Sequence, residues 1–181
     1  MRVARWEDWS GRGLEHLVLT ERATAIVAVA VCIVADQPPY AVRYRVECDA
    51  EWRCREVDVE IVDSGRTVRL RGDGRGRWTD GEGARLPHLD GAIDVDLSIT
   101  PFTNTLSIRR LDLAAGDARE IAVVYVRAPA LRVDLDHQRY ICVEPRRRYR
   151  YEAVDGTFAA DIEVDADGLV LTYPGLFRRR G

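Results

Sequence analysis

The chain has 181 residues, the length of one ordinary domain, and we expect a single domain over 1–181. Its 27 basic and 30 acidic residues give a net charge of −3, a balance that argues against nucleic acid as the partner. The longest apolar run, 25–35, is shorter than the ~20 residues of a membrane-spanning helix, and the first residues lack the apolar core of a signal peptide. We therefore expect a soluble, cytoplasmic protein.

The four cysteines give no sign of a metal site. Cys32, Cys48, Cys54 and Cys142 have no CxxC spacing, and no histidine lies at a metal-ligand interval from them. Each cysteine lies in a strand-like run, which predicts buried, reduced thiols. We expect no metal and no cofactor.

Alternation of apolar and polar residues dominates the chain. Residues 40–48, 68–71, 131–136 and 158–164 all follow this period of two, which predicts strands with one buried and one wet face. Residues 25–35 and 119–128 are apolar on both faces, so we expect these strands to be covered on both sides.

The turns favour antiparallel pairing. Asp-Gly, the sequence of tight hairpin turns, occurs at 73–74, 80–81, 90–91, 155–156 and 167–168. The segment GDGRGRW, 72–78, suggests a phosphate loop at first sight, but it is not GxGxxG and no helix follows it, so a hairpin is the better interpretation. The alternation slips between Cys54 and Val57, which predicts a β-bulge near Arg55 and Glu56.

One helix is predicted, over about 101–111. Thr100 supplies a hydroxyl N-cap, and Pro101 fits the first helical position, where its missing N–H costs nothing. Apolar residues surround the helix axis, which indicates an enclosed helix. The predicted fold is mainly β, a single long antiparallel sheet curled around one short helix.

Two arginines stand near the end of this helix. Arg109 projects on the same side as Phe102 and Leu106, so its guanidinium needs a partner. A structural ion pair with Asp94 or Asp96 on the preceding strand is one hypothesis. A second is that Arg109, with Arg110, contacts an anionic or polyhydroxylated ligand. A third is that the side chain extends to solvent.

The run GAIDVDLSITPFTNTLSIRRLDL, 91–113, resembles the signature of the bacterial putative glycolipid-binding family. Other segments fit in order along the whole chain, among them GLEHL, LRGDGRGRW, HQRYICV and GLVLTYPGLF. The resemblance implies a spiral β-roll around one helix and a homodimer. Ser107 stands where the family pattern has proline, which we expect to affect only how the helix ends.

Non-catalytic binding of an amphipathic, glycolipid-like ligand is the leading functional hypothesis. A site for such a ligand needs aromatic and polar side chains, and the candidates are Trp52, Trp78, Tyr125, Tyr140, Gln138, Arg109 and Arg110. The alternative is that the aromatic residues fill the core, as aromatic residues on strands more often do.

Two alternatives remain. The first is an enzyme of unknown reaction that uses His88 with Asp90, or Arg109 with a carboxylate. No GxSxG, HExxH or Cys–His signature accompanies these residues, and no catalytic residue is assigned. The second is a structural or interaction protein that acts as a homodimer, because a long sheet has edges and faces to cover.

Overall fold

The computed structural model describes residues 1–35 and 37–181. It contains one α-helix, α1 (Phe102–Leu111), and a short 3-10 helix (Pro87–Leu89) among the described residues. The strands are β1 (Arg2–Asp8), β2 (Leu14–Glu21), β3 (Ala25–Val34), β4 (Tyr40–Asp49), β5 (Cys54–Ile61), β6 (Arg66–Gly72), β7 (Trp78–Asp80), β8 (Asp94–Leu97), β9 (Ala118–Arg127), β10 (Arg132–Glu144), β11 (Arg148–Ala153), β12 (Ala159–Val164), β13 (Val170–Tyr173) and β14 (Phe177–Arg180).

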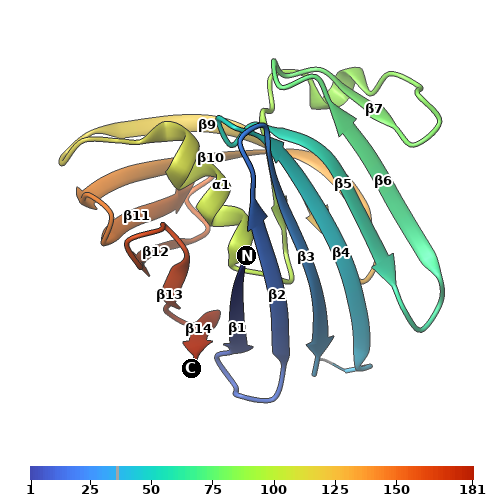
Figure 1. The fold of residues 1–181 in the computed structure, drawn as a ribbon, viewed down its shortest axis with the longest axis horizontal. Helices are drawn as coiled ribbons and strands as arrows, with labels where there is room; N and C mark the ends of the chain where they lie inside the picture. The colour runs from blue at the N-terminus through green and yellow to red at the C-terminus, as the bar shows by residue number, and fades with distance from the viewer. Residues whose placement is uncertain (36) are drawn as a thin grey trace.

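The strands form one 14-stranded sheet in the order β7-β6-β5-β4-β3-β2-β1-β14-β13-β12-β11-β10-β9-β8. β1 and β14 are neighbours, so the two ends of the chain meet in the middle of the sheet. The sheet curls without closing, and α1 lies inside it (Figure 1). The predicted fold class is confirmed.

One strand pair departs from the antiparallel pattern. β8 pairs with β9 in parallel, with Asp94 opposite Val123 and Leu97 opposite Val126. Parallel neighbours need a long crossover connection, and α1 provides it. The helix therefore joins two neighbouring strands of the same sheet, and it lies on the inner side of the roll.

Local predictions along the sheet are confirmed. The register shifts where Glu47 faces Glu56 and Cys48 faces Cys54, which leaves Arg55 as the extra residue of a bulge. Residues 73–77 form the hairpin between β6 and β7, and the Asp73 carboxylate accepts hydrogen bonds from the backbone of Arg75 and Arg77.

The helix is enclosed for most of its length. Phe102 through Ile108 are all buried. Phe102 and Leu106 pack in a core with β1–β6, while Ile108 packs in a second core with β10–β13. Thr100 Oγ1 accepts the Phe102 N–H at 3.0 Å, and the helix ends where Asp112 adopts a left-handed conformation.

Strand β3 is apolar on both faces, and it turns its smaller side chains toward the core. Ala28, Ala30 and Cys32 face inward, and the larger Val29, Val31 and Ile33 face outward with 42–58% of their surface exposed. The expectation that this strand is covered on both sides is therefore wrong for the single chain. These small inward side chains belong to the same core as Ile99 and Phe102, at the start of the helix.

Candidate functional site at one end of the roll

A buried ion pair fastens the helix to β8. Arg110 donates from Nε and from its terminal nitrogen to the two oxygens of Asp94, both at 2.8 Å, and Ser107 Oγ also donates to Asp94 at 2.8 Å. Asp94 is fully buried and the Arg110 side chain is 16% exposed. Such bidentate, charge-assisted bonds are among the strongest that proteins make.

This arrangement corrects the predicted ion pair. Arg110, not Arg109, is the partner of Asp94, because Thr103, Ser107 and Arg110 lie on one helix face, four and three residues apart, and that face meets β8. Ser107 lies inside the helix, so its effect is a hydrogen bond to Asp94 and not a change in the helix end.

Asp96 is the second carboxylate on the inner side of β8. It accepts hydrogen bonds from Thr103 Oγ1 at 2.8 Å and from Gln138 Nε2 at 2.7 Å. Burial raises its pKa, and the two hydrogen bonds act in the opposite direction. Asp96 has no arginine partner in the part of the chain that the structure describes.

Arg109 lies at the last turn of the helix, where it is one-third exposed. Its guanidinium is 4.7 Å from the centre of the Trp52 ring and donates to the backbone oxygen of Asp167 at 2.9 Å. A carboxylate oxygen of Glu21 is 4.0 Å away. Its partners are thus an aromatic face, a carbonyl and a distant carboxylate, and neither Asp94 nor Asp96 is among them.

A polar cavity of about 580 Å³ surrounds this end of the helix, and we call it the arginine cavity. Its lining residues are Ala50, Glu51, Trp52, Ile108, Arg109, Arg110, Asp112, Arg146, Tyr149, Ala166, Asp167 and Gly168. Two of its arginines are already held by groups of the protein, and three acidic residues share its walls. Its large apolar lining residues are Trp52, Ile108 and Tyr149.

The opposite end of the helix meets a different carboxylate. Glu15, on β2, points inward and is 3% exposed. Its Oε1 accepts hydrogen bonds from Tyr44 Oη at 2.5 Å and from Thr100 Oγ1 at 2.9 Å. Its Oε2 is buried without a hydrogen-bond partner, a state shared among the described side chains only by Thr105 Oγ1. Burial raises the pKa of Glu15 to about 7, against the effect of the two hydrogen bonds.

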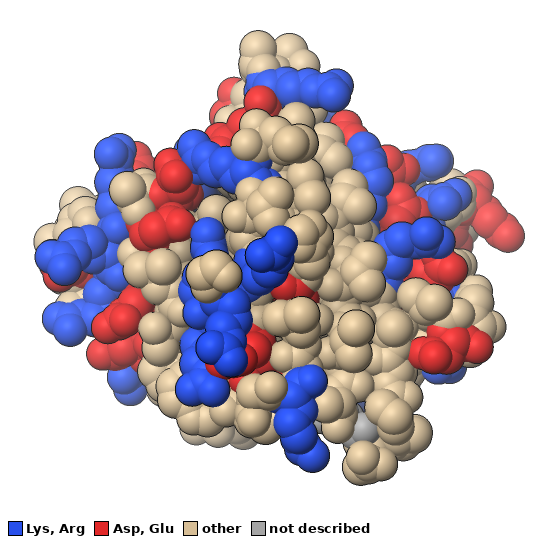
Figure 2. All heavy atoms as spheres, turned by 60° about the horizontal axis from the view of Figure 1, so that its bottom comes forward, with Lys and Arg blue, Asp and Glu red and all other residues tan. Residues whose placement is uncertain are grey.

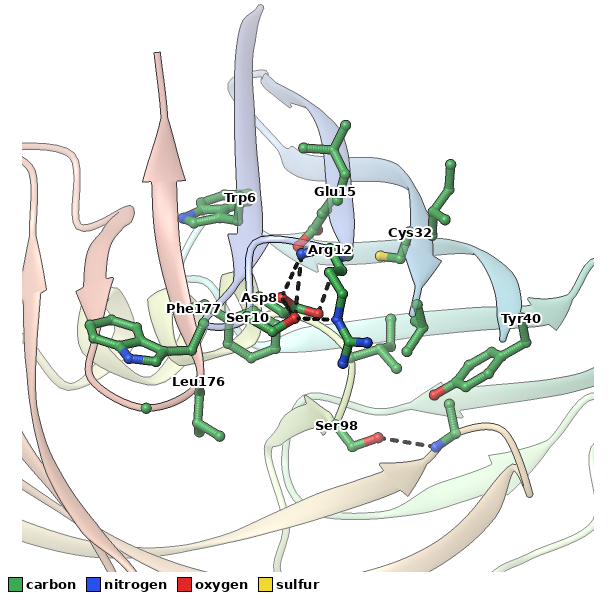
Figure 3. A pocket seen from close by; sticks show the side chains of 18 of the residues that line it. Trp6, Asp8, Ser10, Arg12, Glu15, Cys32, Tyr40, Ser98, Leu176 and Phe177 are labelled. Carbon is green, nitrogen blue, oxygen red and sulfur yellow. Dashed lines mark hydrogen bonds between the residues drawn. The ribbon is translucent and has the colours of Figure 1, made fainter. Parts of the chain in front are cut away.

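Glu15 forms part of the wall of a cavity of about 480 Å³, which we call the tryptophan cavity. In Figure 3, Arg12 extends from the β1–β2 loop toward the side on which Tyr40 and Ser98 lie. The lining residues are Trp6, Asp8, Trp9, Ser10, Arg12, Gly13, Leu14, Glu15, Cys32, Ile33, Val34, Tyr40, Ser98, Ile99, Arg127, Ala128, Gly175, Leu176 and Phe177.

A second cavity adjoins it, with a volume of about 360 Å³, which we call the tyrosine cavity. The two cavities share the lining residues Ser98, Arg127, Leu176 and Phe177. The other lining residues of the tyrosine cavity are Asp96, Leu97, Thr100, Asn104, Tyr125, Asp136, Tyr151, Ala153, Asp155, Thr157, Phe158 and Tyr173. Both cavities combine charged and hydroxyl groups with aromatic and aliphatic ones. The tryptophan cavity has Trp6 and Trp9 among its walls, and the tyrosine cavity has more acidic and tyrosine side chains.

The structure separates the predicted ligand-binding residues into three places. Trp52, Arg109 and Arg110 line the arginine cavity. Tyr125 lines the tyrosine cavity, and behind that wall Gln138 bonds to Asp96 and Tyr140 Oη donates to Asn104 at 2.9 Å.

Trp78 is apart from both groups. It is buried, and its indole N–H donates to the backbone oxygen of Ala92 at 2.7 Å. It serves the core.

The predicted histidine site is not assembled. His88 is exposed in the 3-10 helix, and both oxygens of Asp90 accept hydrogen bonds from Arg85 at 2.9 Å. Neither residue lines any of the three cavities. The hypothesis of a His88–Asp90 enzyme gains no geometric support.

Within residues 1–35 and 37–181, no group of three or more histidine, cysteine or acidic side chains is placed to hold a metal ion. No helix in that part of the chain is long and apolar enough to cross a membrane. On the face that Figure 2 brings forward, arginine and acidic side chains are interleaved around uncharged surface.

A family model described as "Putative glycolipid-binding" matches residues 3–179. The chain belongs to this family. A crystal structure of a DUF1089-family protein from Pseudomonas aeruginosa superposes with a TM-score of 0.80 at 39% sequence identity, and 92% of each chain is covered. A search of curated proteins finds no match.

The family match spans all three cavities, so the fold that surrounds them is the family's fold. Membership does not choose among the cavities, because no residue role comes with it. The choice rests on the chemistry of their walls.

Proposed function

We propose that this member of the glycolipid-binding family binds an amphipathic glycoside without transforming it, in the joined tryptophan and tyrosine cavities. The observation that carries the proposal is that two adjoining cavities, which share Ser98, Arg127, Leu176 and Phe177, both combine aromatic or aliphatic walls with charged and hydroxyl groups. An amphipathic glycoside likewise combines an apolar tail with hydroxyl groups.

The tyrosine cavity suits the head group. The side chains of Asp96, Asp136 and Asp155 accept hydrogen bonds, and Asn104 and Thr157 both donate and accept. Sugar hydroxyls need acceptors as well as donors, and the tyrosine rings supply apolar surface between them.

The tryptophan cavity suits the tail. Trp6, Trp9, Ile33, Val34 and Ile99 form its apolar walls. Its volume of about 480 Å³ lies in the range of small-molecule sites, ~300–1,000 Å³.

The test is binding of octyl β-D-glucoside below its micelle concentration, followed by calorimetry and by tryptophan fluorescence. Leu176→Arg places a charged side chain in the wall that both cavities share, and we expect it to weaken binding by at least about tenfold. Leu171→Arg is the matched control, because Leu171 is also 39% exposed and lines neither cavity. Equal loss in both variants, or no binding by the unchanged protein, contradicts the proposal. Release of free glucose contradicts its non-catalytic part.

A second proposal, a homodimer, has its own support in the exposed outer face of β1–β3. Val3, Leu14, Val29, Val31 and Ile33 lie there with 42–58% of their surface exposed. Cross-strand pairing joins them into one patch, since Val29 faces Val18, and Ile33 faces Leu14. A second copy of the chain, which the family resemblance implies, would cover this patch.

Sedimentation velocity tests the dimer. Val31→Arg is expected to convert the dimer to a monomer. Val62→Arg is the control, because Val62 is similarly exposed at 50% but lies in the β5–β6 turn, off this face. A monomer before any substitution contradicts the proposal.

A further inference from the structure

Glu15 is a buried carboxyl group in the wall of the tryptophan cavity. It forms part of the tryptophan cavity, while Thr100, to which it is hydrogen-bonded at 2.9 Å, forms part of the tyrosine cavity. In the sheet its neighbours are Trp6 on β1 and Cys32 on β3. Glu15 and Thr100 thus connect the walls of the two cavities through one hydrogen bond.

The hydrogen bonds of Glu15 distinguish its two oxygens. Tyr44 and Thr100 both donate to Oε1, so this oxygen already receives two hydrogen bonds. When both hydroxyl groups donate to Oε1, the proton of the neutral acid is on Oε2, which is the oxygen without a partner. A buried O–H group without an acceptor costs free energy. Because Oε2 is buried, the carboxyl group must rotate toward the cavity before a ligand oxygen can accept its hydrogen bond and recover that free energy.

The surroundings of Glu15 favour the neutral acid. Tyr44 and Cys32 are the titratable groups next to it, and burial keeps both protonated by raising their pKa values. Asp8, Arg12 and Arg127 are the charged residues on the other walls of the cavity. Neither arginine forms an ion pair with Glu15 in the described structure, so no cation stabilises the carboxylate.

The chemistry of a glycosidic link fits this group. The link oxygen carries no hydrogen, so it accepts a hydrogen bond but cannot donate one. A protonated carboxyl group is its complement, whereas an ionised carboxylate would repel it. We propose that Glu15 is the protonated hydrogen-bond donor of this site and that its Oε2–H holds the oxygen that links head group and tail. This inference rests on the proposed glycoside-binding function.

The experiment compares octyl β-D-glucoside with octyl β-D-thioglucoside, in which a sulfur atom, a weak acceptor, replaces the link oxygen. Affinities are measured from about pH 5.5 to about pH 8.5. For the unchanged protein we expect the oxygen glucoside to bind about fivefold more tightly than the sulfur analogue at low pH. Above the pKa of Glu15, near 7, its affinity falls about tenfold per pH unit because only the protonated fraction binds.

Glu15→Gln removes the proton equilibrium but keeps an N–H donor at the same place. This variant is expected to bind the oxygen glucoside with no pH dependence. Glu21→Gln, the same substitution on the same strand outside both cavities, is expected to follow the unchanged protein.

The outcomes separate the two proposals. Failure of both glucosides to bind at any pH overturns the glycoside-binding function and this inference with it. Binding without pH dependence in the unchanged protein, or with the same dependence in Glu15→Gln, overturns the inference alone. Equal affinity for the oxygen and sulfur probes does so too.

Discussion

Each end of α1 lies beside a buried carboxyl group, and the two groups differ in their hydrogen-bond partners. At its C-terminal end, Asp94 is fully buried and saturated by Arg110 and Ser107. At the end that begins with Thr100, Glu15 is also buried, but it has two hydroxyl donors and one oxygen without a partner. The paired carboxylate holds the helix against β8, whereas the unsatisfied one lies in a cavity wall, where we propose that a ligand binds.

The largest expected effect is on stability, at the paired end. Arg110→Met leaves Asp94 buried without its cation, so the free energy of unfolding is expected to fall by about 3–5 kcal/mol in urea titrations. Arg69→Met, which breaks the exposed pair with Asp58, is the control and is expected to cost at most about 1 kcal/mol. Similar losses in the two variants would mean that the Asp94 pair is no stronger than a surface contact.

The next effect is the pH dependence of stability at the unsatisfied end. The pKa of Glu15 is about 7 in the folded protein and near 4.5 when unfolded. Between these values the folded state holds a proton that the unfolded state has lost, so the stability contribution, complete below about pH 4.5, declines until about pH 7.

The whole decline amounts to about 3 kcal/mol. The Glu15→Gln variant should not show this decline. Relative to the unchanged protein, its free energy of unfolding should therefore rise by the same amount between low pH and pH 8, as measured by urea titration. Parallel pH profiles for the two proteins would show that Glu15 has an ordinary pKa.

The smallest effect concerns Arg109. Arg109→Ala loses the contact with the Trp52 ring and a bond to a backbone oxygen, and is expected to cost about 1 kcal/mol of stability. Because Arg109 lines only the arginine cavity, octyl glucoside affinity should stay the same. A loss of affinity in this variant would move the ligand to the other end of the helix.

The fold could be predicted well from the sequence because its signals are local. Alternation, Asp-Gly turns and Thr100-Pro101 each depend on a few adjacent residues, and the Arg55 bulge is visible as a slip in the alternation. The parallel pairing of β8 with β9 was missed, since direction depends on the crossover and not on either strand.

The site was harder to predict because it depends on which face of a strand is inside. In β2, Leu14, His16 and Val18 form one face and Glu15, Leu17 and Leu19 the other, so both contain large apolar residues. Alternation alone favours neither face. Pairing with Trp6 and Cys32 places Glu15 inside, and no local pattern reveals this.

For the arginines a signal was present in the sequence. The spacing of Thr103, Ser107 and Arg110 marks one polar helix face that could have matched Asp94 and Asp96 on β8. The apolar neighbours of Arg109 favour that arginine as the partner of Asp94, but Arg110 forms the pair.

The most direct test of the ligand's position is a map of backbone amide NMR shifts during titration with octyl glucoside. We predict the largest changes at Ser98, Thr100, Leu176 and Phe177, where the tryptophan and tyrosine cavities meet. Changes centred on Trp52, Arg109 and Gly168, around the arginine cavity, would contradict the assignment of the ligand to the unsatisfied end of the helix.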